Sequence, residues 1–472
     1  MIYTSFGFLV GDSGNREGAA GLTRGTGILP MVAMLLLGAP LEGAWMAGVA
    51  KIDITPKESV PLAGYGGATR LSDQVLHPIW VKALAMRDDT GATSVVVSAD
   101  LVGLSAKMVD LIARRALEQH HIARNHLILN YSHNHSCPVT ADVLWLYYDL
   151  KAEEAAARDR YTDALYDRYE QVIGKAIADM EPAELSFGQG LAGFAVNRRR
   201  ARPGGRGFGG QVDHDVPVLR VTTGGRDKAL LFGYSCHTTT LSGRAISGDY
   251  AGYAQIELEE NFPGAVAMFI QNCGGDANPL PRRSRSDEPA ATALAEMYGK
   301  ILAEAVRQTV SGKMTPVGGP MRVAMGEARL DFEQGPTLAE LEAGLQRQSG
   351  MPRRESEHLI RQFRESGGPP GSVIYPIQVW HFGRELTFIA LTGETVVDYS
   401  LRFKAAYGWE NTWVAGYNND LLSYIPSLRV LKEGDYEGAT GMKEYGHRAP
   451  YTETVEHRIA AKVDELVRQM RH

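Results

Sequence analysis

The feature that most constrains the fold of this chain is an alternation of short apolar segments with longer amphipathic stretches, which begins near Ala47. Runs rich in valine, isoleucine and leucine, such as Leu127–Tyr131 and Val266–Gln271, have the length and composition of buried strands. The stretches between such runs place apolar residues at helical spacing. This order predicts an α/β protein in which mixed sheet layers are flanked by helices.

The two kinds of segment define a set of expected elements. We predict strands at residues 82–87, 94–99, 127–131, 216–221, 229–235, 266–271 and 386–391. We predict helices at residues 106–119, 153–180, 250–260, 289–308, 338–348, 396–406 and 453–470. Glycine and proline residues mark predicted loops at 202–210 and 364–372. No clean boundary follows residue 46, so we expect residues 46–472 to form a single large domain.

Residues 1–45 are predicted to be a leader that precedes the folded domain. Arg24 is followed by the apolar run 28–37 and then by small residues at Gly43 and Ala44, which is the pattern of a secretory signal. The run is too short to cross a bilayer as a helix, which takes about 20 apolar residues. We therefore expect export to the periplasm or the exterior, and a leader without a signal function is the alternative.

Charge and cysteine content exclude two classes of protein. The net charge is -6 and the charged residues are evenly scattered, so we expect no nucleic-acid partner. Asp213 and Asp215 are expected to be solvated at the entry of a strand. Three cysteines are an odd number and too few for a disulfide framework, so at least one thiol is unpaired within the chain.

Two histidines, His133 and His135, follow directly after the predicted strand Leu127–Tyr131. In an extended chain residues two apart face the same side, and neutral imidazole is the commonest metal ligand in proteins. Strand ends are where open α/β sheets bind ligands. A single His-x-His motif is short, however, and taken alone it favours two solvated histidines in a loop.

A second and a third strand end in potential ligands. The apolar segment 230–236 leads to His237, and the segment 388–393 leads to Glu394. Alone, His237 is more typical of a hydrogen-bonded structural histidine. Because two strands of one sheet each deliver a histidine at the end, a shared site becomes the better interpretation.

Another apolar strand, Val266–Gln271, leads to Gly274, Gly275 and Asp276. Glycines allow close approach to the backbone and leave N–H donors accessible, which suits a substrate or oxyanion pocket. An ordinary Gly-Asp turn is the alternative.

The order of these motifs resembles that of the neutral/alkaline non-lysosomal ceramidases, which are zinc amidases that cleave the N-acyl bond of ceramide. Segments 48–56, 64–67 and 97–101 are similar to the first segments of that family, and the resemblance extends over roughly residues 46 to 440. It implies a catalytic N-terminal domain that holds one zinc ion.

The resemblance also implies roles for individual residues. The zinc ligands would be His133, His237, Glu394 and Tyr424. Tyr417 lies close to Tyr424 in the sequence and is the alternative fourth ligand. His135 would be the active-site partner of the metal, and Arg198 would line the catalytic centre.

Two positions depart from the family pattern. The active-site serine of the family aligns with Asn278, so a serine nucleophile is not present at that position. The serine of the family's Asn-Arg-Ser segment is replaced by Arg199. The chain also ends soon after the catalytic region, so we expect it to lack the additional C-terminal β-sandwich of the ceramidases. These departures affect the choice of substrate and leave the zinc chemistry unchanged.

The resulting prediction is a zinc-dependent hydrolase that cleaves an N-acyl bond with metal-activated water. Zinc lowers the pKa of bound water from about 15.7 to about 7. His135 would pass a proton to the leaving amine, while Arg198 and Asn278 would stabilise the oxyanion. Asp100 or Asp276 would orient a ligand histidine.

The substrate would be a small molecule or a lipid, and a lipid substrate implies peripheral contact with a membrane. One alternative is a zinc esterase or lactonase on the same scaffold. The other is an inactive protein that binds acylated ligands.

Overall fold

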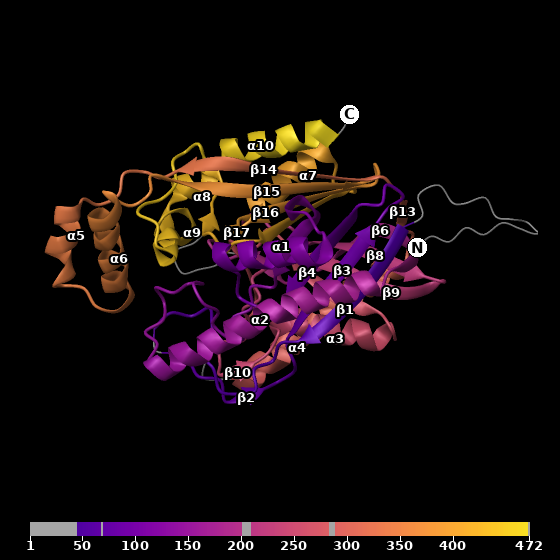
Figure 1. Ribbon diagram of the computed structural model, residues 1–472, viewed down its shortest axis with the longest axis horizontal. Coiled ribbons are helices and arrows are strands. Elements are labelled where there is room, and N and C mark those ends of the chain that lie inside the picture. Colours follow the sequence, from indigo (N-terminus) through magenta and orange to yellow (C-terminus); the bar gives the residue numbers. More distant parts are fainter. Residues whose placement is uncertain (1–44, 68, 201–208, 283–287, 471–472) are drawn as a thin grey trace, which may run out of the picture. The chain divides into compact units, whose positions relative to one another are not determined.

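The computed structural model describes residues 45–67, 69–200, 209–282 and 288–470 (Figure 1). Within these residues the central element is a 13-stranded sheet with the order β11-β9-β8-β6-β1-β3-β4-β5-β18-β16-β15-β14, in which β13 also pairs with β6. Its strands are β1 Trp45–Asp53, β3 Trp80–Arg87, β4 Thr93–Ala99, β5 Leu127–Tyr131, β6 Glu181–Leu191, β8 Asp215–Thr223, β9 Arg226–Tyr234, β11 Val266–Gln271, β13 Thr315–Val317, β14 Met321–Asp331, β15 Ser372–Phe382, β16 Leu386–Thr392 and β18 Thr412–Asn418. Parallel and antiparallel pairs are mixed: β4–β5, β9–β11 and β16–β18 are parallel.

The helices and the short strands complete the described fold. The helices are α1 Ala106–His120, α2 Ala152–Ala178, α3 Asp249–Asn261, α4 Glu288–Ser311, α5 Leu338–Leu345, α6 Gly350–Ser366, α7 Val397–Tyr407, α8 Leu428–Glu433, α9 Asp435–Gly438 and α10 Val455–Met470, with 3-10 turns η1 Arg124–His126 and η2 Thr440–Tyr445. Three two-stranded sheets pair β10 Ala245–Ile246 with β2 Gln74–Val75, β12 Ala277–Pro279 with β7 Ala195–Asn197, and β17 Glu394–Thr395 with β19 Tyr424–Ile425.

The large sheet curves around an inner hydrophobic core. One cluster of buried side chains joins Trp45 of β1, Met268 of β11 and Trp413 of β18, which belong to strands far apart in the strand order. An isolated bridge between Asn272 and Ala415 also brings the end of β11 beside β18. Burial of the shared apolar face accounts for this curvature, because apolar area removed from water stabilises a fold by about 25 cal/mol per Å².

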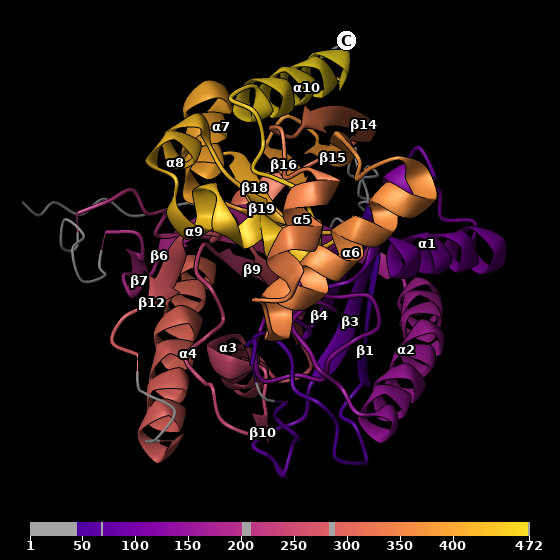
Figure 2. The same ribbon diagram turned by 90° about the vertical axis from the view of Figure 1, so that its left-hand side faces the viewer.

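Three pairs of helices cover the outward faces of the sheet. Helices α1 and α2 pack on β1, β3 and β4, helices α3 and α4 on β8, β9 and β11, and helices α7 and α10 on β14 to β18. Figure 2 shows the three pairs on three sides of the strands. Local signals support these helices: the Ser105 hydroxyl, for example, accepts a hydrogen bond from the Met108 N–H and caps α1.

The predicted α/β fold is confirmed, and each predicted strand and helix lies on an element of the structure. Strands β1, β6, β14, β15 and β18 and helix α6 were not predicted. The predicted loop at 364–372 is too long, because α6 continues to Ser366 and ends at Gly367, whose positive φ of 77° glycine adopts without strain. Residues 1–44 of the predicted leader and most of the predicted loop at 202–210 lie outside the described residues, and Trp45, the last residue of the predicted leader, begins β1.

The prediction that Asp213 and Asp215 are solvated at a strand entry is wrong for Asp213. Its side chain is buried and accepts hydrogen bonds from the Lys404 ammonium at 2.7 and 2.9 Å and from the Ser400 hydroxyl at 2.6 Å. Lys404 comes from α7, so a distant part of the chain supplies the counter-ion that makes the burial possible.

All three cysteines are free and buried, which agrees with the predicted unpaired thiol. Among the described helices, none combines the length and the apolar character needed to cross a bilayer.

Candidate metal centre

Three potential metal ligands meet in the interior, each just beyond the carboxyl end of a strand. His133 follows β5, His237 follows β9, and Glu394 follows β16. The Glu394 Oε2 atom lies 3.3 Å from His133 Nε2 and 3.0 Å from His237 Nε2. All three side chains are buried, with at most 2% of each exposed. The fold therefore brings together three of the four residues predicted as metal ligands.

Both imidazoles are oriented by backbone carbonyl groups. His133 Nδ1 lies 2.6 Å from the Val102 oxygen, and His237 Nδ1 lies 2.7 Å from the Gly274 oxygen. Because a carbonyl oxygen only accepts, each Nδ1 carries the hydrogen and each Nε2 presents a lone pair toward Glu394. Burial and then the nearby charge of Arg198 lower the pKa of His237 to about 4, which keeps this imidazole neutral.

The prediction that Asp100 or Asp276 orients a ligand histidine is therefore wrong. The Asp100 carboxylate accepts hydrogen bonds from the Trp80 N–H and the Gln255 amide. The Asp276 carboxylate binds other groups, namely the Val397 N–H and the Asn197 amide. Both aspartates stabilise neighbouring loops without touching the imidazoles.

The separations of the two imidazole nitrogens from the Glu394 oxygen are compatible with a zinc ion. Zinc binds nitrogen and oxygen donors at about 2.0 to 2.2 Å in a tetrahedron, which places neighbouring donors about 3.3 Å apart. The two separations from Glu394 Oε2 are 3.0 and 3.3 Å. A set of two imidazoles and one carboxylate also suits zinc better than calcium or magnesium, which prefer oxygen ligands.

Tyrosine side chains surround this group. The Tyr417 hydroxyl donates to Glu394 Oε2 at 3.4 Å, and the Tyr445 hydroxyl donates to Glu394 Oε1. Tyr424 lies directly opposite Glu394 in the parallel β17–β19 pair, and its ring stacks on His237 with a centroid distance of 6.5 Å. Of these three tyrosines, only Tyr424 lines the cavity beside the metal ligands.

That cavity has a volume of about 200 Å³. Its lining residues are Gly64, Tyr65, Gly66, His135, Tyr147, Arg198, His237, Thr239, Asn278, Arg282, Tyr424 and Tyr436. Three buried polar atoms of this lining have no protein partner: His135 Nδ1, Thr239 Oγ1 and Asn278 Oδ1. An unsatisfied buried polar atom costs about 1 to 3 kcal/mol, so their concentration here indicates a cavity that receives polar groups.

His135 lies beside the metal ligands, but not for the predicted reason. Its Nε2 atom is 3.3 Å from His133 Nε2. The chain is not extended here, since His133 has a positive φ of 54°, so the expected alternation of side chains does not apply. Burial, followed by the neighbouring His133 and His237, lowers the pKa of His135 well below its ordinary value and leaves a neutral imidazole.

Arg198 and Asn278 are brought together by the short strands β7 and β12. Asn278 pairs with Val196 in that ladder, and Arg198 follows the end of β7. The Arg198 Nη1 atom lies 3.3 Å from His237 Nε2, and Nη2 donates to the Tyr424 hydroxyl at 3.0 Å. Both predicted oxyanion groups therefore line the cavity, and Arg198 lies beside His237.

The predicted substrate-binding residues Gly274, Gly275 and Asp276 do not line the cavity. The Gly275 N–H donates to the Thr395 oxygen, and a side chain at Gly275 would collide with the backbone beside Glu394. The arrangement favours a role in supporting His237 over the substrate contact that the sequence suggested.

Known proteins compare with this chain in two ways. Residues 45–317 match the family described as neutral/alkaline non-lysosomal ceramidase, N-terminal. The neutral ceramidase from Pseudomonas aeruginosa superimposes with a TM-score of 0.67 at 19% identity, over 88% of this chain and 72% of that chain. A ceramidase complexed with C2 gives a TM-score of 0.65 at 17% identity, over 88% and 73% of the two chains. None of the curated protein sequences compared with the chain matches it.

The fold and the family match together define a hydrolase. Since the match covers more than half of its length, the chain belongs to the neutral/alkaline non-lysosomal ceramidase family. The resemblance seen in the sequence is thereby confirmed.

Proposed function

We propose that this protein is a zinc-dependent hydrolase that cleaves an N-acyl amide bond. The observation that carries the proposal is the convergence of His133, His237 and Glu394, whose donor atoms all lie within 4.8 Å of one another, beside a buried polar cavity. Membership of the ceramidase family supports an amide substrate, either ceramide or a related N-acyl compound. A lipid of this kind would reach the protein from a membrane surface.

The proposed zinc ligands are His133, His237, Glu394 and Tyr424. Tyr424 is favoured over Tyr417 because it faces Glu394 in the strand register and borders the cavity. The adjacent Arg198 guanidinium would also stabilise a phenolate at this position. When bound, zinc would polarise an acyl carbonyl and lower the pKa of water to about 7.

Three side chains around the cavity would serve proton transfer, oxyanion stabilisation and substrate binding. His135 has a neutral imidazole and an unpartnered Nδ1, so it can accept a proton and pass it to the departing amine. Arg198 offers a cationic donor to a developing oxyanion. Asn278 presents a side-chain amide to the same cavity, and its unpaired Oδ1 suits an N–H donor of the substrate.

The test combines metal analysis with two classes of chromogenic substrate. Wild type, His133→Ala and His457→Ala would be assayed on an N-acyl p-nitroanilide and on an O-acyl p-nitrophenyl ester of the same chain length. His457 is exposed on α10 and serves as the matched control. We expect about one zinc per chain and anilide turnover in wild type and His457→Ala, and loss of both in His133→Ala.

Other outcomes distinguish the alternatives. Turnover of the ester alone would replace the amidase by an esterase or lactonase. Zinc binding without turnover of either substrate would indicate a protein that binds acylated ligands. Absence of zinc from the wild type would overturn the metal site itself.

We also propose that residues 1–45 direct export, on the basis of the sequence pattern alone. Fractionation of cells that express residues 1–472 or residues 46–472 tests this. Recovery of both forms in the same compartment would contradict it.

A further inference from the structure

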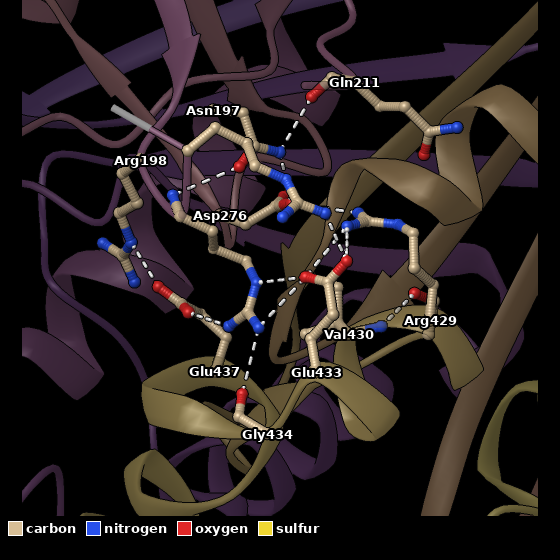
Figure 3. Close-up of polar contacts among 12 residues, drawn as sticks. Asn197, Arg198, Gln211, Asp276, Arg429, Val430, Glu433, Gly434 and Glu437 are labelled. Carbon is tan, nitrogen blue, oxygen red and sulfur yellow. Dashed lines mark hydrogen bonds and ion pairs between the residues drawn. The ribbon is translucent and has the colours of Figure 1, made fainter. Parts of the chain in front are cut away.

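Consecutive arginines after β7 meet two glutamates from the α8–α9 segment. Arg198 Nε donates to Glu437 Oε1 at 2.7 Å, and Arg199 Nη1 donates to Glu437 Oε2 at 2.5 Å. Figure 3 shows the Arg198–Glu437 contact and the neighbouring Glu433. One carboxylate therefore bridges an arginine of the cavity and an arginine behind it.

Among the described residues, the hydrogen-bond partners of the Arg199 side chain all lie in the α8–α9 segment. Its Nη2 donates to the Gly434 oxygen at 3.0 Å, and both Nε and Nη2 lie 3.3 Å from Glu433 Oε2. Its side chain is 4% exposed, and that of Glu437 is 2% exposed. Arg199 does not line the cavity, so any effect on the reaction must pass through its neighbours.

The first of these neighbours is Arg198. The Nε atom of the Arg198 guanidinium donates a hydrogen bond to Glu437. Because the guanidinium is planar, this bond fixes its orientation, and the two Nη atoms face His237 and Tyr424. Without Arg199, Glu437 loses one of the two arginines described beside it and the hydrogen bond from Arg199 Nη1. The carboxylate is then held less firmly, and so is the Arg198 guanidinium that it fixes.

The second neighbour is the cavity wall. Tyr424 and Tyr436 both line the cavity, and the segment between them contains Glu433 and Gly434. The contacts of Arg199 therefore hold this wall against the end of β7. Gly434 has a positive φ of 68° between two short helices, so regular structure does not stabilise the segment at that point.

We infer that Arg199 is a positioning residue. Through Glu437 it fixes the orientation of the Arg198 guanidinium. Through Glu433 and the Gly434 oxygen it holds in place the part of the cavity wall that Tyr424 and Tyr436 form. The inference rests on the proposed function insofar as Arg198 acts on the substrate. It concerns the position at which this chain replaces the serine of the family pattern by arginine.

The kinetic test compares Arg199→Ser with Arg200→Ser. Both variants remove one positive charge and one partner of Glu433. Arg200, unlike Arg199, makes no described contact with Glu437 or with the Gly434 oxygen. We expect Arg199→Ser to lower kcat at least tenfold, with KM and zinc content within about threefold of wild type, because the lost interaction acts in the transition state. Arg200→Ser should stay within about twofold of wild type. Arg199→Lys keeps the positive charge but lacks the several N–H donors of the planar guanidinium, so its kcat should lie between those of wild type and Arg199→Ser.

Crystal structures of the same variants give a readout that does not depend on activity. The 3.0 Å contact from Arg198 Nη2 to the Tyr424 hydroxyl should be lost in Arg199→Ser and kept in Arg200→Ser. Equal kcat values for these two variants, or an Arg198 that keeps its contacts in Arg199→Ser, would overturn the inference. If Arg199→Ser does not fold, Arg199→Lys is judged by the same two criteria.

If the wild type cleaves no amide, the proposed function fails, and the crystallographic comparison alone decides whether Arg199 positions Arg198.

Discussion

Replacing Glu437 with glutamine tests the bridged arginines by their effect on stability. Burial alone would raise the pKa of Glu437, but the guanidinium groups of Arg198 and Arg199 outweigh it and hold this pKa at about 2, against an ordinary value of 4.5. A carboxyl group with a lowered pKa in the folded state stabilises the protein at pH values above its ordinary pKa. That stabilisation is lost as the pH falls from about 4.5 toward 2.

The magnitude follows from the two pKa values. The gap between 4.5 and 2 corresponds to about 3 kcal/mol of stabilisation at neutral pH. At pH 3.5 the unfolded carboxyl is largely protonated, while the folded one is still ionised. Linkage then removes about 1.4 kcal/mol of the advantage of wild type over Glu437→Gln.

Urea unfolding of wild type and Glu437→Gln at pH 6.5 and pH 3.5 measures this change. A chelator in all samples removes the metal contribution, and the difference between the two proteins cancels the other titrating groups. We expect the gap in unfolding free energy to shrink by about 1.4 kcal/mol between the two pH values. A gap that stays constant within about 0.3 kcal/mol would refute an ionised, arginine-bound Glu437.

Three further outcomes are expected. Tyr424→Phe should lower zinc affinity by about tenfold or more in competition with a chromogenic chelator, and Tyr417→Phe should lower it less; the reverse order would make Tyr417 the ligand. Gly64→Ala places a methyl group in the space of the His135 ring, so kcat should fall at least about tenfold while the zinc content stays unchanged. Full activity of this variant would contradict the position of the His135 imidazole. Lys404→Met leaves a buried aspartate without its counter-ion and should cost about 3 to 5 kcal/mol in urea unfolding, where a loss below about 1 kcal/mol would contradict the pairing.

The sequence predicted most strands that read as continuous apolar runs and missed several others, among them β18, which is buried at every residue. Strand β5 is buried at every residue and reads as a continuous apolar run. Strand β14 is half-exposed along most of its length at the edge of the sheet, and its sequence mixes arginine and glutamate with small residues. Its pairing with β15 is a tertiary feature, which no local pattern of the chain reveals.

The candidate site was predictable where a strand delivers the ligand. His237 and Glu394 each follow an apolar segment, so their positions could be inferred from strand geometry and the order of motifs. Tyr445 and Glu437 could not be inferred in this way, because they come from short helical segments after β19 and reach the site only through the folded chain. The same holds for the carbonyl groups that orient the histidines, since every residue has one.

Those two carbonyl groups decide how the centre can change during evolution or redesign. No substitution deletes a main-chain oxygen. The orientation of the His133 and His237 imidazoles therefore depends on the backbone of the loops after β4 and β11. The cavity wall, by contrast, is built from side chains that can be exchanged one at a time. A redesign can therefore change the substrate specificity while the backbone continues to orient the two metal-binding histidines in the same way.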